Sequence, residues 1–207
     1  MLGRMPPAPI DFYFDFISPY GWFASRQIEA LAARHGRRVN WHTMLLGVSV
    51  LKVMGLKPLL DTPLKGDYVR RDVLRHVRRL GLNMGRSLEA PFMDPRAAGR
   101  AFHWVKQERP EWAGALAHAI FQAYWGEGRD LSSSEALAAI DLPAGIDATW
   151  LRAGIDGPES GPLLRVAVDA SLKRGVFGSP TVQVDGEMFW GFDRLADVDE
   201  WLQRGGW

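Results

Sequence analysis

The chain contains no cysteine, and this absence removes several classes of chemistry. Without a thiol side chain the protein has no disulfide bond, no thiolate metal site and no cysteine nucleophile. A thiol that arrives as part of a bound molecule is still able to react. Any thiol chemistry at this protein therefore has to use the thiol of a ligand.

Long apolar runs are also missing. No stretch approaches the roughly 18 apolar residues that a membrane-spanning helix needs, and residues 1–9 lack the apolar centre of an export signal. We therefore expect a cytoplasmic protein with no membrane partner.

Neither sign of charge is in excess. Twenty-five Lys and Arg residues stand against 24 Asp and Glu, which gives a net charge of +1. This balance argues against nucleic acid as a partner, and the arginines within 70–79 are better explained as a solvated helix face. The histidines lack metal-ligand spacing, so we expect no metal.

The length and composition are those of an ordinary folded protein. The chain has 207 residues, of which 47% are hydrophobic and 24% charged. This is enough to bury one full core and rather short for two independent domains.

The first 46 residues have the pattern of a βαβ unit. Apolar and polar residues alternate over 10–17, which predicts a strand. A helix is predicted to begin at Ser18 and Pro19 and to end near Gly36, and a second strand is predicted over 39–46. Such a unit normally has parallel strands and a right-handed crossover.

The middle of the chain, residues 67–173, is mainly helical in pattern. The predicted helices cover 69–80, 97–109, 110–125, 132–143 and 163–173. Ser132 and Glu135 match a capping box at the start of the fourth helix, which Pro143 is predicted to close.

The end of the chain returns to strands. Residues 181–184 and 187–190 flank Asp185-Gly186, a strong hairpin signal, and Asp193 is predicted to cap a terminal helix. The order βαβ, helices, ββα predicts an α/β thioredoxin-like fold with a large all-helical insertion. We expect the thioredoxin-like domain to comprise 8–66 and 174–207, with 67–173 as the insertion domain.

Ser18-Pro19-Tyr20-Gly21 is the most informative motif, because it lies where a parallel strand leads into a helix. Unpaired N–H groups and the positive end of the helix dipole favour an anion there. Ser followed by Pro is also a favourable purely structural helix start, so both interpretations stay open at this point.

Four segments together resemble the 2-hydroxychromene-2-carboxylate isomerase family. They are Asp-Phe-Tyr-Phe-Asp-Phe-Ile-Ser-Pro-Tyr at 11–20, Ala-Tyr-Trp-Gly-Glu-Gly-Arg-Asp at 123–130, Val-Phe-Gly-Ser-Pro-Thr at 176–181 and Asp-Gly-Glu-Met-Phe-Trp-Gly-Phe-Asp-Arg-Leu at 185–195. This family belongs with the kappa-class glutathione transferases in the DsbA-like branch of the thioredoxin fold. The resemblance covers about residues 10–203.

The resemblance implies that glutathione is the cofactor. Ser18, which stands where redox relatives carry their first catalytic cysteine, would hydrogen-bond the sulfur of glutathione. The backbone of Ser179, before an expected cis-Pro180, would pair with the cysteinyl part of the tripeptide. The γ-glutamyl end would lie against Trp190, Gly191, Phe192 and Asp193.

The same resemblance suggests further contacts. Lys65 aligns with a lysine that is often found in the superfamily, and Lys52 and Leu56 fall on the side of the substrate. Leu56 stands where relatives commonly have Asn. An alternative explanation for both lysines is an exposed position with no ligand.

The implied reaction interconverts 2-hydroxychromene-2-carboxylate and trans-o-hydroxybenzylidenepyruvate through addition and elimination of a thiolate. The implied partners are a small aromatic carboxylate, glutathione and a second copy of the chain in a homodimer. Two alternatives stay open: a kappa-like transferase or peroxidase acting on another electrophile, and a non-catalytic module that binds glutathione or a peptide.

Overall fold

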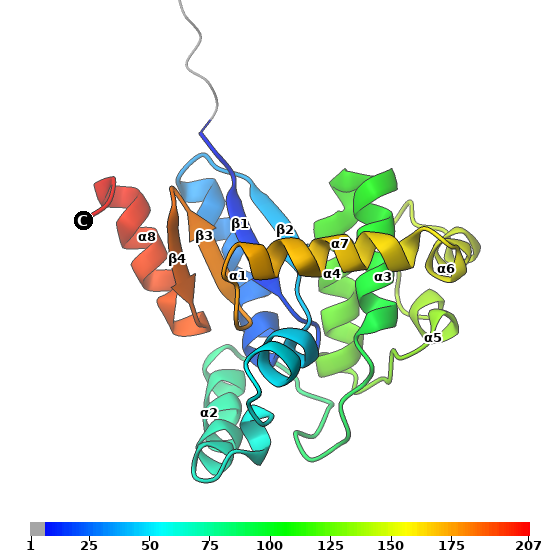
Figure 1. Cartoon of the computed structure of the whole chain (residues 1–207), viewed down its shortest axis with the longest axis horizontal. Helices are drawn as coiled ribbons and strands as arrows, with labels where there is room; N and C mark the ends of the chain where they lie inside the picture. Colours follow the sequence, from blue (N-terminus) through cyan, green and yellow to red (C-terminus); the bar gives the residue numbers. More distant parts are fainter. Residues whose placement is uncertain (1–6) are drawn as a thin grey trace, which may run out of the picture.

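A four-stranded sheet forms the centre of the computed structural model, which describes residues 7–207 (Figure 1). The strand order is β2-β1-β3-β4. Strand β1 (Ile10–Phe14) pairs in parallel with β2 (Val39–Thr43) and antiparallel with β3 (Thr181–Val184). Strand β4 (Glu187–Trp190) extends the sheet as a hairpin with β3. Part of segment 1–9, in which we expect no export signal, lies outside the described residues.

Helices cover both faces of this sheet. The α-helices are α1 (Pro19–Arg34), α2 (Lys65–Arg79), α3 (Arg96–Glu108), α4 (Ala113–Phe121), α5 (Ser134–Ala138), α6 (Ala148–Asp156), α7 (Ser160–Lys173) and α8 (Leu195–Arg204). The part of the chain that the structure describes also contains two π-helices, η1 (Gly47–Val53) and η4 (Gln122–Gly126), and three 3-10 turns, η2 (Leu59–Asp61), η3 (Pro110–Trp112) and η5 (Phe192–Arg194).

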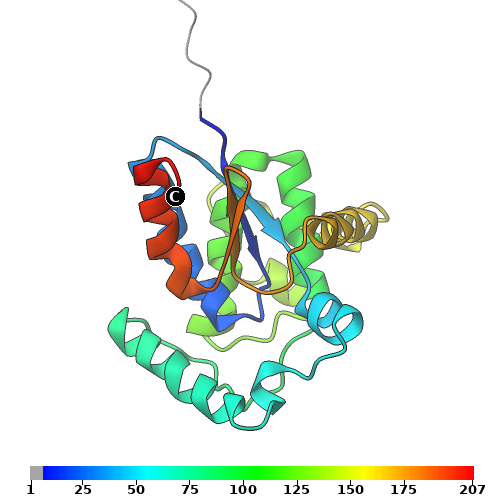
Figure 2. The same cartoon turned by 60° about the vertical axis from the view of Figure 1, so that its left-hand side comes forward.

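The layers are clear when the molecule is turned. Helices α1 and α8 lie on one face of the sheet and α7 crosses the other (Figures 1 and 2). Helix α2 stands apart from α3–α7, at the end of the sheet where β1 leads into α1 (Figure 2). The hydroxyl of Tyr20 on α1 donates a 2.8 Å hydrogen bond to Asp72 on α2 and so links the two helices.

The predicted thioredoxin-like path is confirmed. The parallel β1–β2 pair and the hairpin at Asp185-Gly186 form where the sequence placed them. Both N-terminal strands end three residues before their predicted ends. After Phe14 the chain turns, since the N–H of Ser18 donates to the carbonyl of Asp15 over 3.0 Å.

Helix boundaries in the middle of the chain differ from the prediction. Ser133, not Ser132, caps α5, and its Oγ accepts from the N–H of Ala136 at 3.1 Å. Helix α5 also ends at Ala138, well before Pro143. Helix α6 was not predicted; its cap is Asp147, whose carboxylate accepts from the N–H of Trp150.

The aromatic core joins the sheet to the helices. The ring of Phe14 on β1 contacts Phe102 of α3 and Phe121 of α4, with centroids 5.4 and 5.5 Å apart. The indole of Trp125 on η4 donates a 2.9 Å hydrogen bond to the carbonyl of Phe16. The helical part therefore contacts and stabilises the turn between β1 and α1.

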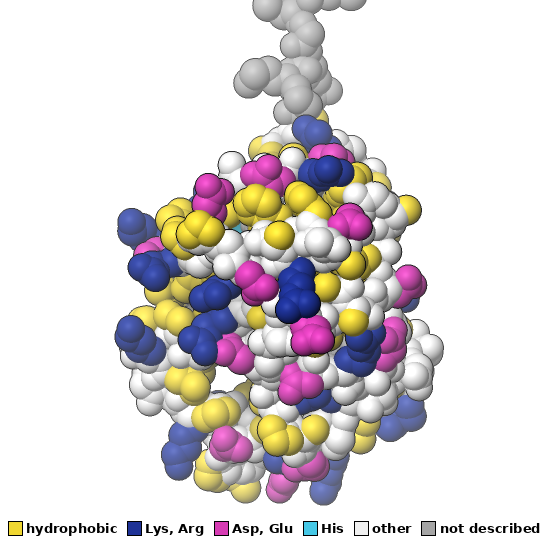
Figure 3. All heavy atoms as spheres, turned by 90° about the vertical axis from the view of Figure 1, so that its right-hand side faces the viewer, with side chains coloured by type: hydrophobic (Ala, Val, Ile, Leu, Met, Phe, Trp, Pro, Cys, Tyr) yellow, Lys and Arg dark blue, Asp and Glu magenta, His cyan; other side chains and the backbone are white. Residues whose placement is uncertain are grey.

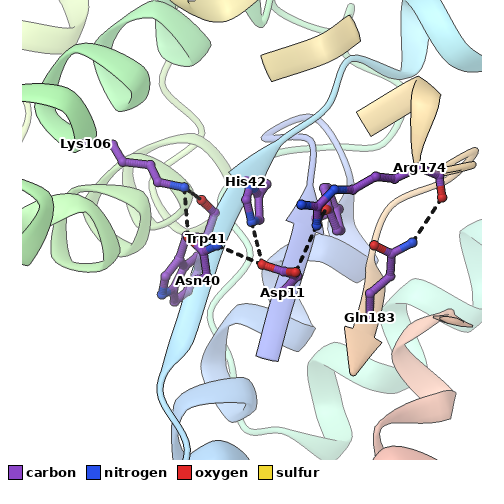
Figure 4. A network of polar contacts seen from close by, with 8 residues as sticks. Asp11, Asn40, Trp41, His42, Lys106, Arg174 and Gln183 are labelled. Atoms are coloured by element: carbon purple, nitrogen blue, oxygen red, sulfur yellow. Dashed lines mark hydrogen bonds and ion pairs between the residues drawn. The ribbon is translucent and has the colours of Figure 1, made fainter. Parts of the chain in front are cut away.

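A polar network links the sheet to α3 and to the end of α7 (Figure 4). The carboxylate of Asp11 on β1 accepts from the Asn40 side chain at 2.8 Å and from Arg174 at 3.0 Å. The ammonium of Lys106 on α3 donates to the Asn40 side chain and to the carbonyl of Trp41. These bonds fix the helices to the sheet at the end away from Ser18.

The surface is mixed in charge. On the side of α6, Lys and Arg side chains are interspersed with Asp and Glu side chains (Figure 3). Within residues 7–207, no helix combines the length and the apolar character required to cross a bilayer.

Candidate functional site

The start of α1 is polar and buried. Ser18 is 4% exposed and has extended backbone angles, and its Oγ accepts from the N–H of Gly21 at 3.0 Å. Pro19 occupies the first helical position, and the first turn contains no acidic side chain. The N–H groups of Gly21 and Trp22 are bonded to Ser18, so in the described part of the chain the N–H of Tyr20 is the donor of this turn that stays open, and with the helix dipole it favours an anion.

The loop before β3 lies directly against this helix start. The hydroxyl of Ser18 donates to the carbonyl of Ser179 at 3.0 Å, and the N–H of Asp15 donates to the Oγ of Ser179 at 2.9 Å. The bond between Ser179 and Pro180 is cis, as expected. Position 21 favours glycine, because an added Cβ would lie 2.9 Å from the Oγ of Ser179, which would have to move.

The segment after β4 is tied to the same loop. The N–H of Gly191 donates to the carbonyl of Pro180 at 3.0 Å. Gly191 has a φ of 120°, and a Cβ there would come within 2.5 Å of the Asp193 carboxylate. The ring of Phe192 packs against Phe23 of α1, with centroids 5.7 Å apart. Residues far apart in sequence thus meet around Ser18.

Two aromatic side chains border this arrangement on the outside. Trp190 is 54% exposed, and its ring centroid lies 4.9 Å from that of Phe177. Its indole covers Gly178, where a Cβ would lie 2.3 Å from the indole nitrogen. The partly exposed indole of Trp190 therefore lies beside the Ser179–Pro180 loop.

The predicted cap at Asp193 is wrong. Asp193 is the second residue of the turn η5, and helix α8 has no side-chain cap. Its exposed carboxylate instead pairs with Arg194 at 3.0 Å. The turn intervenes because the left-handed Gly191 redirects the chain before α8 begins. The carboxylate is therefore available at the surface.

Lys52, Leu56 and Lys65 lie outside this cluster. All three are exposed, and within residues 7–207 no hydrogen bond or ion pair joins either lysine to Ser18. Lys52 was expected in a loop and lies instead in the π-helix η1, while Lys65 begins α2. Residues 51–59 are exposed throughout and carry several apolar side chains: Leu51, Val53, Met54, Leu56 and Leu59.

Sequence reasoning missed the importance of Asp15. This carboxyl is 1% exposed, and its two oxygens accept from the N–H groups of Leu46 at 2.7 Å and Ile17 at 3.2 Å. Burial raises the pKa of Asp15 to about 7, against the opposing effect of these hydrogen bonds. The available signal was an acidic residue inside an aromatic run, three positions before Ser18.

Two open hollows lie elsewhere on the molecule. They have volumes of about 300 and 380 Å³ and share the side chains of Arg26 on α1 and His118 on α4. Neither hollow includes Ser18 or Ser179. We place the candidate site at Ser18 because the long-range hydrogen bonds converge there.

The model of the DSBA-like thioredoxin domain matches residues 9–203. The chain belongs to this family. The match spans the sheet, α1 and the helices between β2 and β3, so the DSBA-like thioredoxin domain includes the helical part.

Individual proteins of known sequence and structure resemble the chain over most of its length. It is 29% identical over 198 residues to 2-hydroxychromene-2-carboxylate isomerase of Pseudomonas putida, covering 94% of each protein. It is 25% identical over 203 residues to human glutathione S-transferase kappa 1, covering 91% of this chain and 88% of the human protein. A solved structure of 2-hydroxychromene-2-carboxylate isomerase superimposes with a TM-score of 0.75 at 26% identity, covering 94% of each chain. These similarities confirm the resemblance seen in the sequence.

Proposed function

We propose that the protein is a glutathione-dependent isomerase that interconverts 2-hydroxychromene-2-carboxylate and trans-o-hydroxybenzylidenepyruvate. The proposal rests on one observation. The hydroxyl of Ser18, the residue before α1, is buried and lies against the backbone of Ser179, and the chain has no cysteine that could take its place. The similarity to the isomerase of Pseudomonas putida supports the choice of reaction.

The residues around Ser18 fit glutathione. The first turn of α1 has no carboxylate to repel a thiolate. The N–H of Phe192 is at the first position of η5, where no acceptor inside the turn is available. The exposed carboxylate of Asp193 suits the amino group of a γ-glutamyl residue, with Trp190 and Gly191 beside it. Lys65 is our candidate for a cationic contact.

Bound glutathione would supply the thiol that adds to the conjugated side chain of the substrate and leaves after the bond has rotated. Ser18 would donate a hydrogen bond to that sulfur by turning its hydroxyl away from the carbonyl of Ser179. In this role Ser18 is a donor and not a nucleophile.

The magnitudes are sufficient for this role. A free thiol has a pKa near 8.5, so only a few per cent of it is ionised at about pH 7. A hydrogen bond to a charged group contributes about 1.5–3 kcal/mol and the end of a helix about 0.3–1 kcal/mol. Together they lower the pKa of the thiol by about one to three units.

The substrate would lie toward residues 51–59. This segment offers apolar side chains such as Leu56 for an aromatic ring and the ammonium of Lys52 for a carboxylate. The homodimer, the cytoplasmic location and the two domain boundaries stay predictions.

The decisive experiment is an ultraviolet assay of chromene isomerisation with and without glutathione. We expect turnover only with glutathione, and no loss of glutathione over many turnovers. Turnover without glutathione would contradict the proposal. Stoichiometric conjugation or peroxide-dependent oxidation would favour a transferase or peroxidase, the class suggested by the human kappa 1 relative. Glutathione binding without any turnover would favour a binding module.

A further inference from the structure

The buried carboxyl of Asp15 has no part in the chemistry proposed above. It follows β1 directly, and its two oxygens accept from the N–H groups of Ile17 and Leu46. An unpaired charge at such a position is costly unless the hydrogen bonds to it are retained. The charged form of Asp15 therefore depends on its hydrogen bonds to Ile17 and Leu46.

Asp15 joins three segments of the candidate site. Its main-chain carbonyl accepts from the N–H of Ser18, and its N–H donates to the Oγ of Ser179. Its carboxylate reaches Leu46, the residue before η1. The helix start, the cis-proline loop and the chain leading to Lys52 thus meet at one residue.

The surroundings of the carboxyl are almost free of charge. Segments 16–19, 44–50 and 176–182 contain no charged side chain. Within residues 7–207, no Lys, Arg or His side chain pairs with the Asp15 carboxylate. The titratable group that faces it is Tyr124 of η4, and the Arg86 guanidinium lies 4.3 Å from the centre of the Tyr124 ring.

We infer that Asp15 is a positioning residue: its carboxylate holds the β1–α1 turn and the chain at Leu46 in one arrangement, and protonation of either oxygen loosens that arrangement. An ionised carboxylate accepts on both oxygens, whereas a protonated carboxyl has one oxygen that acts as a donor. The inference rests on the proposed function in one respect: the β1–α1 turn is assigned to glutathione, and the chain that follows Leu46 is assigned to the substrate.

The burial of this group also fixes the sign of a stability effect. Because the pKa of Asp15 is about 7 in the folded chain and about 4 when unfolded, the folded state binds this proton more tightly. Its contribution to stability is largest below about pH 4, and it declines as the pH rises to about 7. Asp15→Asn removes this dependence.

The test is an amide NMR titration of the full chain without ligand. In the wild type we expect the N–H resonances of Ile17 and Leu46 to shift together with a midpoint near the pKa of about 7. Asp15→Asn abolishes that shift. The control is Asp11→Asn, which makes the same change on β1 at the other end of the sheet and leaves the shift in place. Persistence of the shift in Asp15→Asn, or independent titration of Leu46 and Ile17, would overturn the inference.

A second measurement does not depend on a variant that folds. The side-chain carboxyl carbon of Asp15 in the wild type should titrate near neutral pH, and a midpoint below about 5 would overturn the inference.

Kinetics then separate this inference from the proposed function. We expect the wild-type KM for the chromene to rise about tenfold as the pH falls below about 7, and the KM of Asp15→Asn to stay flat. A KM that follows the wild-type pH profile in the variant contradicts the inference. If glutathione activates neither protein, the proposed function fails, while the amide titration still decides the role of Asp15.

Discussion

The candidate site around Ser18 and the exposed segment that we propose for the substrate are built differently. The thiol side, residues 15–21, 177–181 and 190–193, is joined by hydrogen bonds between distant parts of the chain. Its centre at Asp15, Ser18 and Ser179 is buried or half-buried, and only its edge, at Phe177, Trp190 and Asp193, is exposed. The exposed segment, residues 51–59, has side chains in solvent throughout.

This difference predicts how each of the two parts would recognise its proposed ligand. On the thiol side most contacts involve main-chain atoms, so the arrangement tolerates changes of side chain as long as the backbone keeps its path. In the exposed segment, recognition of the proposed substrate would depend on the side chains themselves. We therefore expect the cofactor to be a more general property of the fold than the substrate.

The largest expected effect is that of Ser18→Ala. Loss of a hydrogen bond to the sulfur, worth about 1.5–3 kcal/mol, should lower the isomerase rate at neutral pH by about 10- to 100-fold and raise the pKa of the bound thiol. Thiolate absorbance of bound glutathione and the pH–rate profile measure both effects.

The matched control is Ser133→Ala, which removes the same kind of cap from α5. Both substitutions cost about 1 kcal/mol of stability, but only the one at position 18 should change the thiol. Equal rates and equal thiolate absorbance in wild type and Ser18→Ala would exclude the role that we assign to the serine.

Gly21→Ala should disturb the thiol side through packing. The new Cβ would press on Ser179, and we expect a loss of about 1–3 kcal/mol in stability and about tenfold weaker glutathione binding. The control is Gly47→Ala in η1, where a Cβ meets nothing within 4 Å and stability should change by less than about 0.5 kcal/mol. Calorimetry measures glutathione binding and thermal unfolding measures stability. Equal losses in Gly21→Ala and Gly47→Ala would contradict the tighter packing that we assign to the thiol side.

Asp193→Ala should raise the KM for glutathione about fivefold, with little change in turnover at saturation, because a charged contact of about 1 kcal/mol is lost at an exposed position. Asp197→Ala is the control, since Asp197 pairs with the same Arg194 at 2.7 Å. Steady-state kinetics on both variants decide this assignment. A fall in turnover without a change in KM would show that the γ-glutamyl contact is misplaced.

The smallest effect is expected in the exposed segment. Leu56→Asn introduces an amide and should change the KM for the chromene by about two- to threefold, while glutathione binding and stability stay within about 0.5 kcal/mol of the wild type. Leu51→Asn, also exposed and in the same segment, is the control. If Leu56→Asn changed glutathione binding more than the KM for the chromene, Leu56 would belong to the thiol side and not to the substrate side.

Much of the fold could be predicted because local signals agreed with the tertiary structure. Alternation and the Asp185-Gly186 turn located the sheet, and Ser18-Pro19 located the first residue of α1. Caps were less certain, since neighbouring serines offer equal local chemistry. Ser132 instead accepts from the N–H of Asp94, a contact 38 residues away that no local pattern reveals.

The candidate site was predictable in part. The resemblance indicated Ser18, Ser179 and Gly191, and the structure brings these three together. Asp15 was missed because alternation assigns it only to the polar face of a strand. Its burial depends on Leu46 and on the loop at Ser179, which approach only after the chain has folded.

The indole bond from Trp125 to Phe16 shows why the helical part cannot simply be excised. A shortened chain that joined β2 directly to β3 would leave Phe14 without the rings of Phe102 and Phe121 and would free the carbonyl next to the helix start. A shortened version of this protein would therefore need other side chains in place of Phe102, Phe121 and Trp125 before its helix start could position a sulfur atom.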